Sequence, residues 1–360
     1  MALTVRENFF RAARRQSPEW IPFDFGFSPG VLKMFRAHVG EGVDPVEYYN
    51  FAGRWAGPSA STRPVPDWRA LYYADAGLPE EAQFDTEWGG ARVYHADVDD
   101  NMQYFPLRHL QTAEEVDAYP WPDAGADYRY VELKARTAEI VASDHVAHIA
   151  GATFFEPVWN LRGFERLLVD MADRAPVALR LYERMHELQV RCAEQVARCG
   201  ADILMTGSDV ASQRGPLMSP AMWRAWIFPM MRDCMQAAKA IKPDLLVMYH
   251  SCGDVSTMID GFLEAGIDIL DPCQPEAMDI FALKQRYGDR LSFHGGIGVQ
   301  SVLPWGTPQE VRDTVRRTID IMGEGGGYIC SSSHTIRPET PWENLVAMVE
   351  AIREYGQAPG

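Results

Sequence analysis

Short apolar runs alternate with longer amphipathic segments through most of this chain, and that alternation restricts the fold more than any other feature. A short apolar run between turn residues is typical of a buried strand, whereas apolar residues at roughly every third or fourth position are typical of a helix. Strands that alternate with helices build a parallel sheet covered by helices, so we expect an α/β fold. The expected strands are residues 21–26, 145–150, 201–205, 245–249, 267–270, 291–293 and 328–330.

About eight such repeats in one chain favour a closed (β/α)8 TIM barrel. The alternative is an open doubly wound sheet, but no G-x-G-x-x-G turn follows the first expected strand. Signals for helix starts support the alternation. A capping box is predicted at Thr112–Glu115, at Thr307–Glu310 and at Thr340–Glu343, and Ser219-Pro220 should cap a long helix that runs to Ala240.

Residues 51–127 depart from the repeating pattern. Proline, glycine and aromatic residues crowd this segment, and the alternation from Ala91 to Tyr94 suggests a hairpin. We expect residues 51–127 to form an irregular N-terminal elaboration over one end of the barrel. The chain as a whole, residues 1–360, is interpreted as one barrel domain.

The charge of the chain restricts its partners. A net charge of −16 gives no basic field that would attract nucleic acid or an anionic membrane surface. No apolar run of about 18 residues is present, so no transmembrane helix is expected. The first residues, MALTVRENFFRAARRQ, lack the apolar core of a signal peptide, which predicts a cytoplasmic protein. The sequence does not decide whether the protein forms a homodimer.

The stretch Leu245–Gly253, LLVMYHSCG, contains the clearest candidate for a functional site. Its apolar first half predicts a buried strand, and His250 and Cys252 follow directly with one spacer. Side chains alternate along an extended chain, so these two should face the same way. Imidazole and thiolate are both preferred zinc ligands. The alternative is a histidine and a cysteine that are merely buried at a strand end.

Polar residues also follow the other expected strands, where barrels place their functional groups. Glu156 and Asp209 are carboxylates at such strand ends and could share one cavity, either as a displaceable metal ligand or as groups that handle a proton. An ion pair with Arg162 or Arg214 is the alternative. Asp271, beside Pro272, could instead cap a loop. Further candidates of this kind are Cys273, His294, Cys330 and His334.

The six cysteines show no spacing typical of a disulfide framework. Cys192, Cys199 and Cys234 lie in expected helices, where a cysteine is usually a small buried hydrophobic residue. A fourth cysteine, Cys273, follows a strand, and it is the one of the four that is expected to reach the barrel mouth. Alkylation of the folded protein should therefore spare the three helical thiols.

The region from about Phe155 to Tyr355 resembles the uroporphyrinogen decarboxylase superfamily. The carrying motifs are FFEPVWNLRGFE at 154–165, GSDVASQRGPLMSP at 207–220, YHSCGDV at 249–255, LSFHGGIGVQSVLPWGTPQEV at 291–311 and GGGYICSSSHTIRPETPWENL at 325–345. The resemblance implies a barrel. True decarboxylases of this family carry an arginine-bearing segment after the first strand, whereas this chain has FDFGFSPG at 23–30. This departure from the family pattern points away from porphyrinogen decarboxylation.

The H-x-C motif resembles the zinc-dependent, corrinoid-linked methyltransferase branch, which includes coenzyme M methyltransferases and the methyltransferase components of O-demethylases. In that branch the third ligand is a cysteine shortly before a segment similar to Ile336–Pro341. His334 occupies that position here, and histidine is also a zinc ligand. Cys330, four residues earlier at the strand end, is the alternative. The resemblance thus implies a zinc site of His250, Cys252 and either His334 or Cys330.

This resemblance implies that a methyl group passes from a methylated small molecule to a cobalt corrinoid, with zinc polarising the heteroatom. The corrinoid motif D-x-H-x-x-G is absent, so the cofactor would come from a separate corrinoid protein. Aromatic residues near expected loops would suit a methoxylated aromatic, although such residues are more often core: Phe23, Phe25, Phe27, Tyr104 and Trp159. The rivals are a metal-independent decarboxylase of a small acid and a non-catalytic binding protein.

Overall fold

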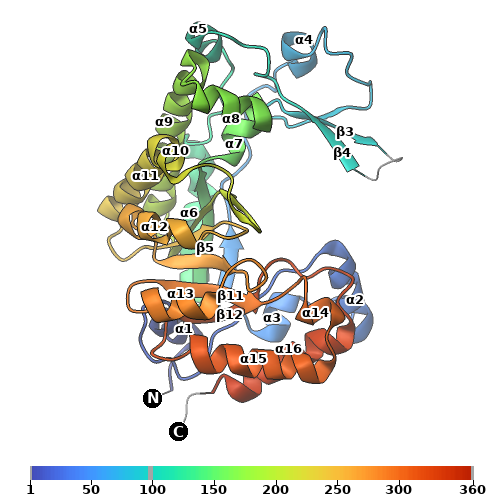
Figure 1. Cartoon of the computed structure of the whole chain (residues 1–360), viewed down its shortest axis with the longest axis vertical. Coiled ribbons are helices and arrows are strands. Elements are labelled where there is room, and N and C mark those ends of the chain that lie inside the picture. The colour runs from blue at the N-terminus through green and yellow to red at the C-terminus, as the bar shows by residue number, and fades with distance from the viewer. Residues whose placement is uncertain (1, 96–99, 358–360) are drawn as a thin grey trace.

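The computed structural model describes residues 2–95 and 100–357. Its centre is a curled sheet of seven parallel strands in the order β1-β5-β6-β9-β10-β11-β12 (Figure 1). Neighbours in the sheet follow one another along the chain, as in a barrel, and this confirms the predicted fold class. The strands are β1 Gly53–Ala56, β5 Val146–Thr153, β6 Ile203–Gly207, β9 Leu246–His250, β10 Ile269–Cys273, β11 Ser292–Ile297 and β12 Tyr328–Ser332.

The segment at residues 21–27 lies beside β12, in the eighth position of the barrel. Two isolated parallel bridges join Phe23 to Cys330 and Phe27 to Ile336. The amide of Cys330 donates to the carbonyl oxygen of Pro22 over 2.9 Å. The amide of Asp24 donates in return to the carbonyl oxygen of Cys330 over 3.3 Å, but the two bridges stay isolated, so the expected first strand is extended without a regular ladder.

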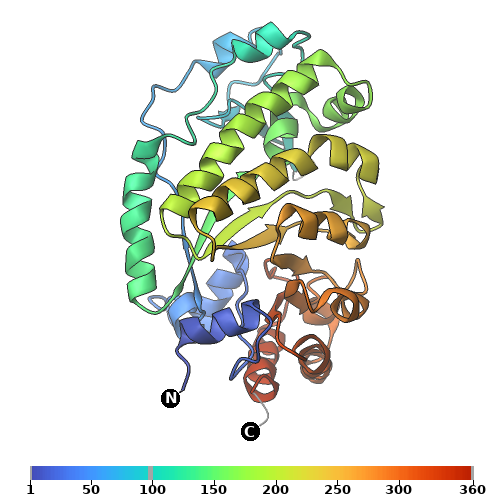
Figure 2. The ribbon, with the colours of Figure 1, turned by 90° about the vertical axis from the view of Figure 1, so that its left-hand side faces the viewer.

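Helices cover the outer side of the sheet. The long helices α9 and α11 lie against each other over the sheet (Figure 2), while α9 also packs on β5 and α15 on β11. In chain order the helices and 3₁₀ turns are α1 Val5–Ala13, α2 Pro29–Val39, α3 Pro45–Tyr49, α4 Trp68–Tyr72, α5 Ala113–Asp117, η1 Asp127–Tyr130, α6 Val131–Ala142, α7 Glu156–Arg162, α8 Phe164–Ala172, α9 Pro176–Arg198, α10 Pro220–Trp226, α11 Phe228–Ile241, η2 Ser256–Met258, α12 Ile259–Ala265, α13 Ile280–Tyr287, α14 Val302–Trp305, α15 Pro308–Met322 and α16 Trp342–Tyr355. Across the described ranges, none of these helices is both long and apolar enough to span a membrane.

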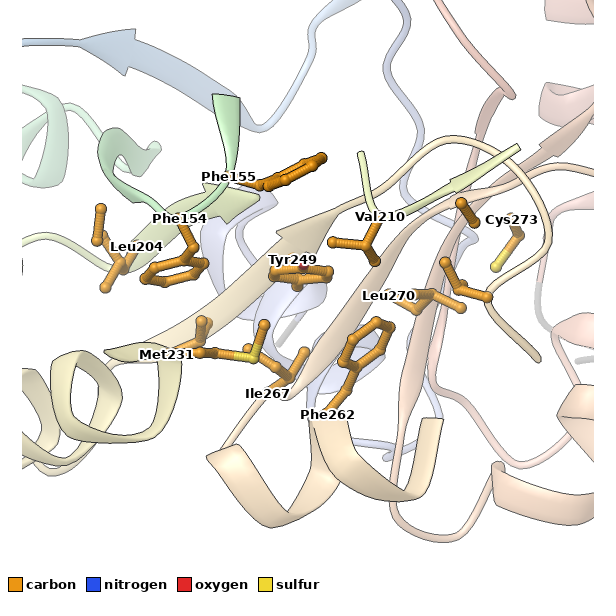
Figure 3. Close-up of a cluster of buried hydrophobic side chains, with 14 of the residues drawn as sticks. Phe154, Phe155, Leu204, Val210, Met231, Tyr249, Phe262, Ile267, Leu270 and Cys273 are labelled. Atoms are coloured by element: carbon orange, nitrogen blue, oxygen red, sulfur yellow. The ribbon is translucent and has the colours of Figure 1, made fainter. Parts of the chain in front are cut away.

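Two apolar layers flank the sheet, as the alternation of side chains along each strand requires. The inner layer closes the amino end of the barrel: Phe9 and Ala13 of α1 pack against Val146, Ile203, Leu246, Ile269 and Ile329. The outer layer lies between the sheet and the helices. Figure 3 shows part of it, with Tyr249 of β9 packed among Phe154, Met231 and Phe262.

The segment expected as an elaboration contains one barrel strand. Residues 53–56 form β1 and pair with β5, so assigning the whole of 51–127 to an elaboration is wrong. The remainder carries α4, α5 and a small antiparallel sheet of β2 Gln83–Phe84, β3 Ala91–His95 and β4 Asp100–Tyr104 (Figure 1). The predicted hairpin is thereby confirmed, and β7 Ala211–Ser212 and β8 Gly215–Pro216 form a second, shorter one.

Some of the helices differ from the prediction. The helix expected at 220–240 is interrupted at Ile227, because Pro229 cannot donate an amide hydrogen to the preceding turn. The capping boxes at Thr112 and Thr307 are confirmed, but Pro341 occupies the cap position of α16 and no side chain caps it. Thr340 therefore precedes the cap position of α16 by one residue. Helix α7, which begins with a Glu-Pro pair, was not expected at all.

Candidate metal centre

Three side chains that can bind a metal ion meet at the carboxyl end of the barrel strands. His250 ends β9, Cys252 lies two residues later, and His334 lies in the loop that follows β12. Their ligand atoms all lie within 4.8 Å of one another, and His250 Nε2 is 3.5 Å from Cys252 Sγ. Within residues 2–95 and 100–357, no other group of histidines, cysteines and carboxylates meets this criterion.

The backbone around β9 explains how His250 and Cys252 reach this point. Tyr249 points into the outer layer, so the neighbouring His250 points into the barrel. On the adjacent strand, a Cβ atom at Gly207 would lie 2.5 Å from the carbonyl oxygen of His250, so only glycine allows this approach. Gly253 adopts a φ of 89°, which turns the chain immediately after the cysteine.

The chemistry of the donor set fits zinc. Nδ1 of His250 donates to Oδ2 of Asp271 over 2.6 Å, so Nε2, which is 3.5 Å from Sγ of Cys252, is the nitrogen left for a metal ion. A carboxylate that orients a histidine in this way is the usual support of a zinc ligand. One thiolate and two imidazoles are ligands that zinc prefers, and three protein ligands leave one position open. These residues therefore fit a catalytic zinc ion.

Asp271 belongs to a longer buried network. Its other oxygen, Oδ1, accepts from Nδ1 of His294 over 2.5 Å, and Nε2 of His294 donates to Asp24 over 2.8 Å. The interpretation of Asp271 as a loop cap is therefore wrong, because its carboxylate binds two imidazoles. Sequence reasoning missed the role of Asp24. The available signal was a single carboxylate within an otherwise aromatic strand segment.

Hydrogen bonds at this site favour the charged forms of its residues. Burial lowers the pKa of His250, but hydrogen bonds to Asp271 and Cys252 outweigh it and raise the pKa to about 11. Burial likewise lowers the pKa of His294, yet the charges of Asp24 and Asp271 raise it to about 10. For Cys252, burial opposes ionisation, but hydrogen bonds from His250 and His334 lower the pKa of the thiol. Cys252 therefore has the character of a ligand thiolate.

The geometry favours His334 over Cys330 as the third ligand. Ile329 and Ser331 face the barrel interior, so Cys330 between them faces the outer layer, where it is completely buried. Burial raises the pKa of the Cys330 thiol to about 12, which disfavours the thiolate that a metal needs. His334 is exposed at the barrel mouth and reaches the other two ligand atoms.

Asp209 lies next to the metal ligands, and Glu156 contacts Asp209 from the neighbouring cavity. Oδ1 of Asp209 is 3.9 Å from Nε2 of His250 and accepts from the amide of Cys252 over 2.8 Å. Oε1 of Glu156 accepts from the amide of Asp209, whereas Oε2 is buried without a partner. Burial raises the pKa of Glu156. The alternative of an ion pair with Arg162 is not observed, since that guanidinium binds Asp170.

A cavity of about 760 Å³ opens beside the ligand cluster and contains His250, His334, Asp24, Asp271 and His294 in its lining. Of the aromatic residues singled out in the sequence, Phe25 and Phe27 line this cavity. Tyr104 and Trp159 line a separate cavity of about 580 Å³ that also contains Glu156. Phe23 lines neither and packs against Phe25 and Phe51. The metal cavity thus combines an aromatic wall with a polar floor.

Five of the six cysteines are buried, and Cys252 alone is partly exposed. The expectation that Cys273 reaches the mouth is wrong, because an irregularity in β10 turns it into the outer layer, where burial raises the pKa of its thiol. We expect iodoacetamide to modify Cys252 first in the metal-free protein. Added zinc should slow that modification, because a metal-bound thiolate is a weaker nucleophile.

Peptide mass mapping of the alkylated protein would measure this order. The three helical cysteines, Cys192, Cys199 and Cys234, serve as internal controls because all three are buried and burial raises the pKa of each. Modification of any of them at the rate of Cys252 in the folded protein would contradict the assignment.

Comparisons with known proteins agree with this architecture. A family model described as uroporphyrinogen decarboxylase (URO-D) matches residues 135–355. Uroporphyrinogen decarboxylase of Methylococcus capsulatus is 29% identical over 100 residues, which are 28% of this chain and 27% of the relative. Methylated-thiol–coenzyme M methyltransferase of Methanosarcina mazei is 31% identical over 159 residues, which are 44% of this chain and 39% of the relative.

The matched segments therefore span less than half the length of these two relatives. A longer match, to uroporphyrinogen decarboxylase of Nostoc punctiforme, is 24% identical over 265 residues and covers 70% of this chain and 71% of the relative. Among solved structures, a methyltransferase from Methanosarcina mazei superimposes with a TM-score of 0.65 at 15% identity and covers 98% of this chain and 99% of the other. At that identity the likeness establishes the fold alone.

Proposed function

This chain belongs to the uroporphyrinogen decarboxylase family, and within that family we propose that it is a zinc-dependent methyltransferase. It would take a methyl group from a methylated small molecule, and a corrinoid on a separate protein would be the acceptor. The observation that carries this proposal is the cluster of His250, Cys252 and His334 on an open cavity, with Asp271 orienting the first ligand. The similarity to a methylated-thiol–coenzyme M methyltransferase supports it.

His250, Cys252 and His334 would bind the zinc ion, which would supply a Lewis acid that polarises the heteroatom bearing the methyl group. Asp271 fixes the tautomer of His250, because Nδ1 keeps its hydrogen and Nε2 remains available as a ligand. His294, held between Asp271 and Asp24, fixes the orientation of the Asp271 carboxylate in turn. The first ligand is therefore positioned before any metal or substrate arrives.

Glu156 and Asp209 are the groups that could handle a proton when the methyl group leaves and the heteroatom needs neutralising. Oε2 of Glu156 is the atom that would carry a proton, since it is buried, has no partner and belongs to a carboxyl whose pKa is raised by burial. The backbone amide of Asp209 donates to Oε1 of Glu156, and the Asp209 carboxylate is 3.9 Å from Nε2 of His250. Its Oδ1 could equally serve as a fourth ligand that the substrate displaces.

A decarboxylase of a small acid is the second candidate, since several relatives bear that name. Decarboxylation of an anionic substrate calls for cations around its carboxylate. Here Asp24 and Asp271 line the cavity, and Arg36 at its rim is the one arginine among the described lining residues. The two carboxylates are already paired with His250 and His294, so Arg36 is the one described arginine or lysine of the lining that is left to bind a substrate carboxylate, and a neutral methylated substrate needs none.

The proposal predicts formation of methylcobalamin. Purified protein supplied with zinc, reduced cobalamin and a panel of O-, N- and S-methyl compounds should convert at least one of them slowly, and faster with a cognate corrinoid protein. The reason is that activation of the heteroatom needs only this chain, whereas efficient capture of the methyl group needs a docked acceptor. The visible spectrum of the cobalt centre follows the reaction.

Omission of zinc is the control for this assay, and it should abolish the signal. If no compound in the panel yields methylcobalamin, while a carboxylated compound releases carbon dioxide, the decarboxylase is the correct assignment.

A further inference from the structure

The metal cavity contains a histidine that belongs neither to the ligand cluster nor to the Asp24–His294–Asp271 network. His148 of β5 lines the cavity and is only 2% exposed. Its Nε2 is buried and has no hydrogen-bond partner. Buried polar atoms without a partner are a small minority in folded proteins, and each calls for an explanation.

The strand register places His148 deeper in the barrel than the metal ligands. His148 is level with Ile203 of β6, which is level with Leu246, the first residue of β9. His250 lies four residues further along β9, roughly 13 Å towards the carboxyl end at about 3.3 Å per residue. His148 is therefore on the floor of a cavity whose rim carries His250.

Two aromatic rings and a glycine of β1 surround the imidazole, and the ring centre of Phe9 lies 5.6 Å from that of His148. His148 is the register partner of Trp55 on β1, and a Cβ atom added at Gly53 would lie only 3.2 Å from the His148 ring. Trp55, two residues later, places its indole edge-on with its ring centre 5.4 Å from that of His148. Both Gly53 and Trp55 line the cavity. Glycine at residue 53 thus lets the imidazole pack directly against the β1 backbone, with no side chain of that residue between the ring and the cavity.

His148 is neutral, whereas its polar neighbours are charged and satisfied. Burial lowers the pKa of His148 to about 4, so at neutral pH one ring nitrogen donates and the other accepts. Asp24, His294 and Asp271 already bind one another. A neutral imidazole near two carboxylates suits a ligand group that is itself neutral and can both donate and accept, such as a hydroxyl.

The wall between floor and rim is aromatic and apolar. It includes Phe25, Phe27, Phe51, Trp55, Met205 and Met248. Such a wall packs well against a flat ring, and a few polar groups at its ends then fix the orientation of that ring. We propose that His148 hydrogen-bonds a hydroxyl group on the aromatic ring of the methylated substrate, which makes the substrate class methoxyphenols rather than simple aryl methyl ethers.

This inference rests on the proposed function for the methoxy end of the ligand, but its test needs no turnover. Binding of 2-, 3- and 4-methoxyphenol and of anisole to the zinc-supplemented protein can be measured by ligand-observed NMR. At least one methoxyphenol should bind about five- to tenfold more tightly than anisole, as one added hydrogen bond between neutral groups provides. His148→Phe, which keeps the ring but removes both nitrogens, should abolish that preference while zinc content stays unchanged.

Two variants control for packing. Met205→Leu changes the same wall without removing a hydrogen-bonding group, so it should keep the preference for the phenol. His148→Gln keeps a donor and an acceptor and should retain part of it, even if the phenylalanine variant folds poorly. A preference that survives in His148→Phe overturns the inference, as does equal or absent binding of all four compounds. A phenol preference lost in His148→Phe supports it even if no methylcobalamin forms, so failure of methyl transfer is told apart from failure of this inference.

Discussion

Cys252→Ser is expected to lose most of its zinc while the barrel remains folded. The thiolate is one of three protein ligands, and its pKa is already lowered by hydrogen bonds from His250 and His334, although burial opposes this. A serine hydroxyl at neutral pH is not ionised and is a poor zinc ligand. Since loss of a mere supporting residue costs about 10- to 100-fold in metal affinity, loss of a ligand should cost at least about 100-fold. Competition with a chromophoric chelator measures this affinity.

Cys330→Ala is the matched control for that variant. Cys330 is the alternative ligand in the sequence, but it is buried in the outer layer and belongs to no ligand group in the described part of the chain. The Cys330→Ala variant should therefore keep wild-type zinc affinity, although the small cavity left by the lost sulfur lowers its free energy of unfolding. His334→Ala should instead behave like Cys252→Ser. Full zinc content in Cys252→Ser, or zinc loss in Cys330→Ala alone, would refute the proposed ligand set.

Asp271→Asn is expected to weaken zinc binding by about 10- to 100-fold without removing any ligand. Its carboxylate binds Nδ1 of His250 and Nδ1 of His294 at once, and it is almost fully buried. An amide offers one accepting oxygen and no charge, so at least one imidazole loses its partner. Breaking such a buried charged pair should also lower the unfolding free energy of the metal-free protein by about 3 kcal/mol. Chelator competition and urea denaturation measure the two effects separately.

Asp170→Asn tests whether lost stability alone explains lost zinc. Asp170 is also a buried aspartate, and it pairs with the fully buried Arg162 over 2.7 Å, outside the metal cavity. Its substitution should destabilise the fold by a similar amount but leave the zinc affinity of the folded protein unchanged. Equal loss of zinc in the two variants would mean that Asp271 has no specific role in orienting His250.

Local patterns in the sequence were sufficient for the barrel and for two of the candidate ligands. The apolar runs at residues 201–205, 245–249 and 328–330 predicted strands that the structure contains, with boundaries shifted by a few residues. Period-two alternation is a property of neighbouring residues, so it shows that His250 and Cys252 lie together at a strand end. The resemblance to the methyltransferase branch, through the segment Ile336–Pro341, indicated His334, which the fold brings within reach of both.

Only the tertiary structure decided which other residues meet these ligands. Asp24 and His294 are 270 residues apart in the sequence, and they touch because the first and later strands close around one interior. Cys330 looked as suitable as His334 until the register of β12 turned it outward, away from the metal. The orphaned nitrogen of His148 is equally invisible in the sequence. The sequence determines local periodicity directly, whereas contacts between distant strands depend on register and on how the closed sheet twists, and no local pattern records either.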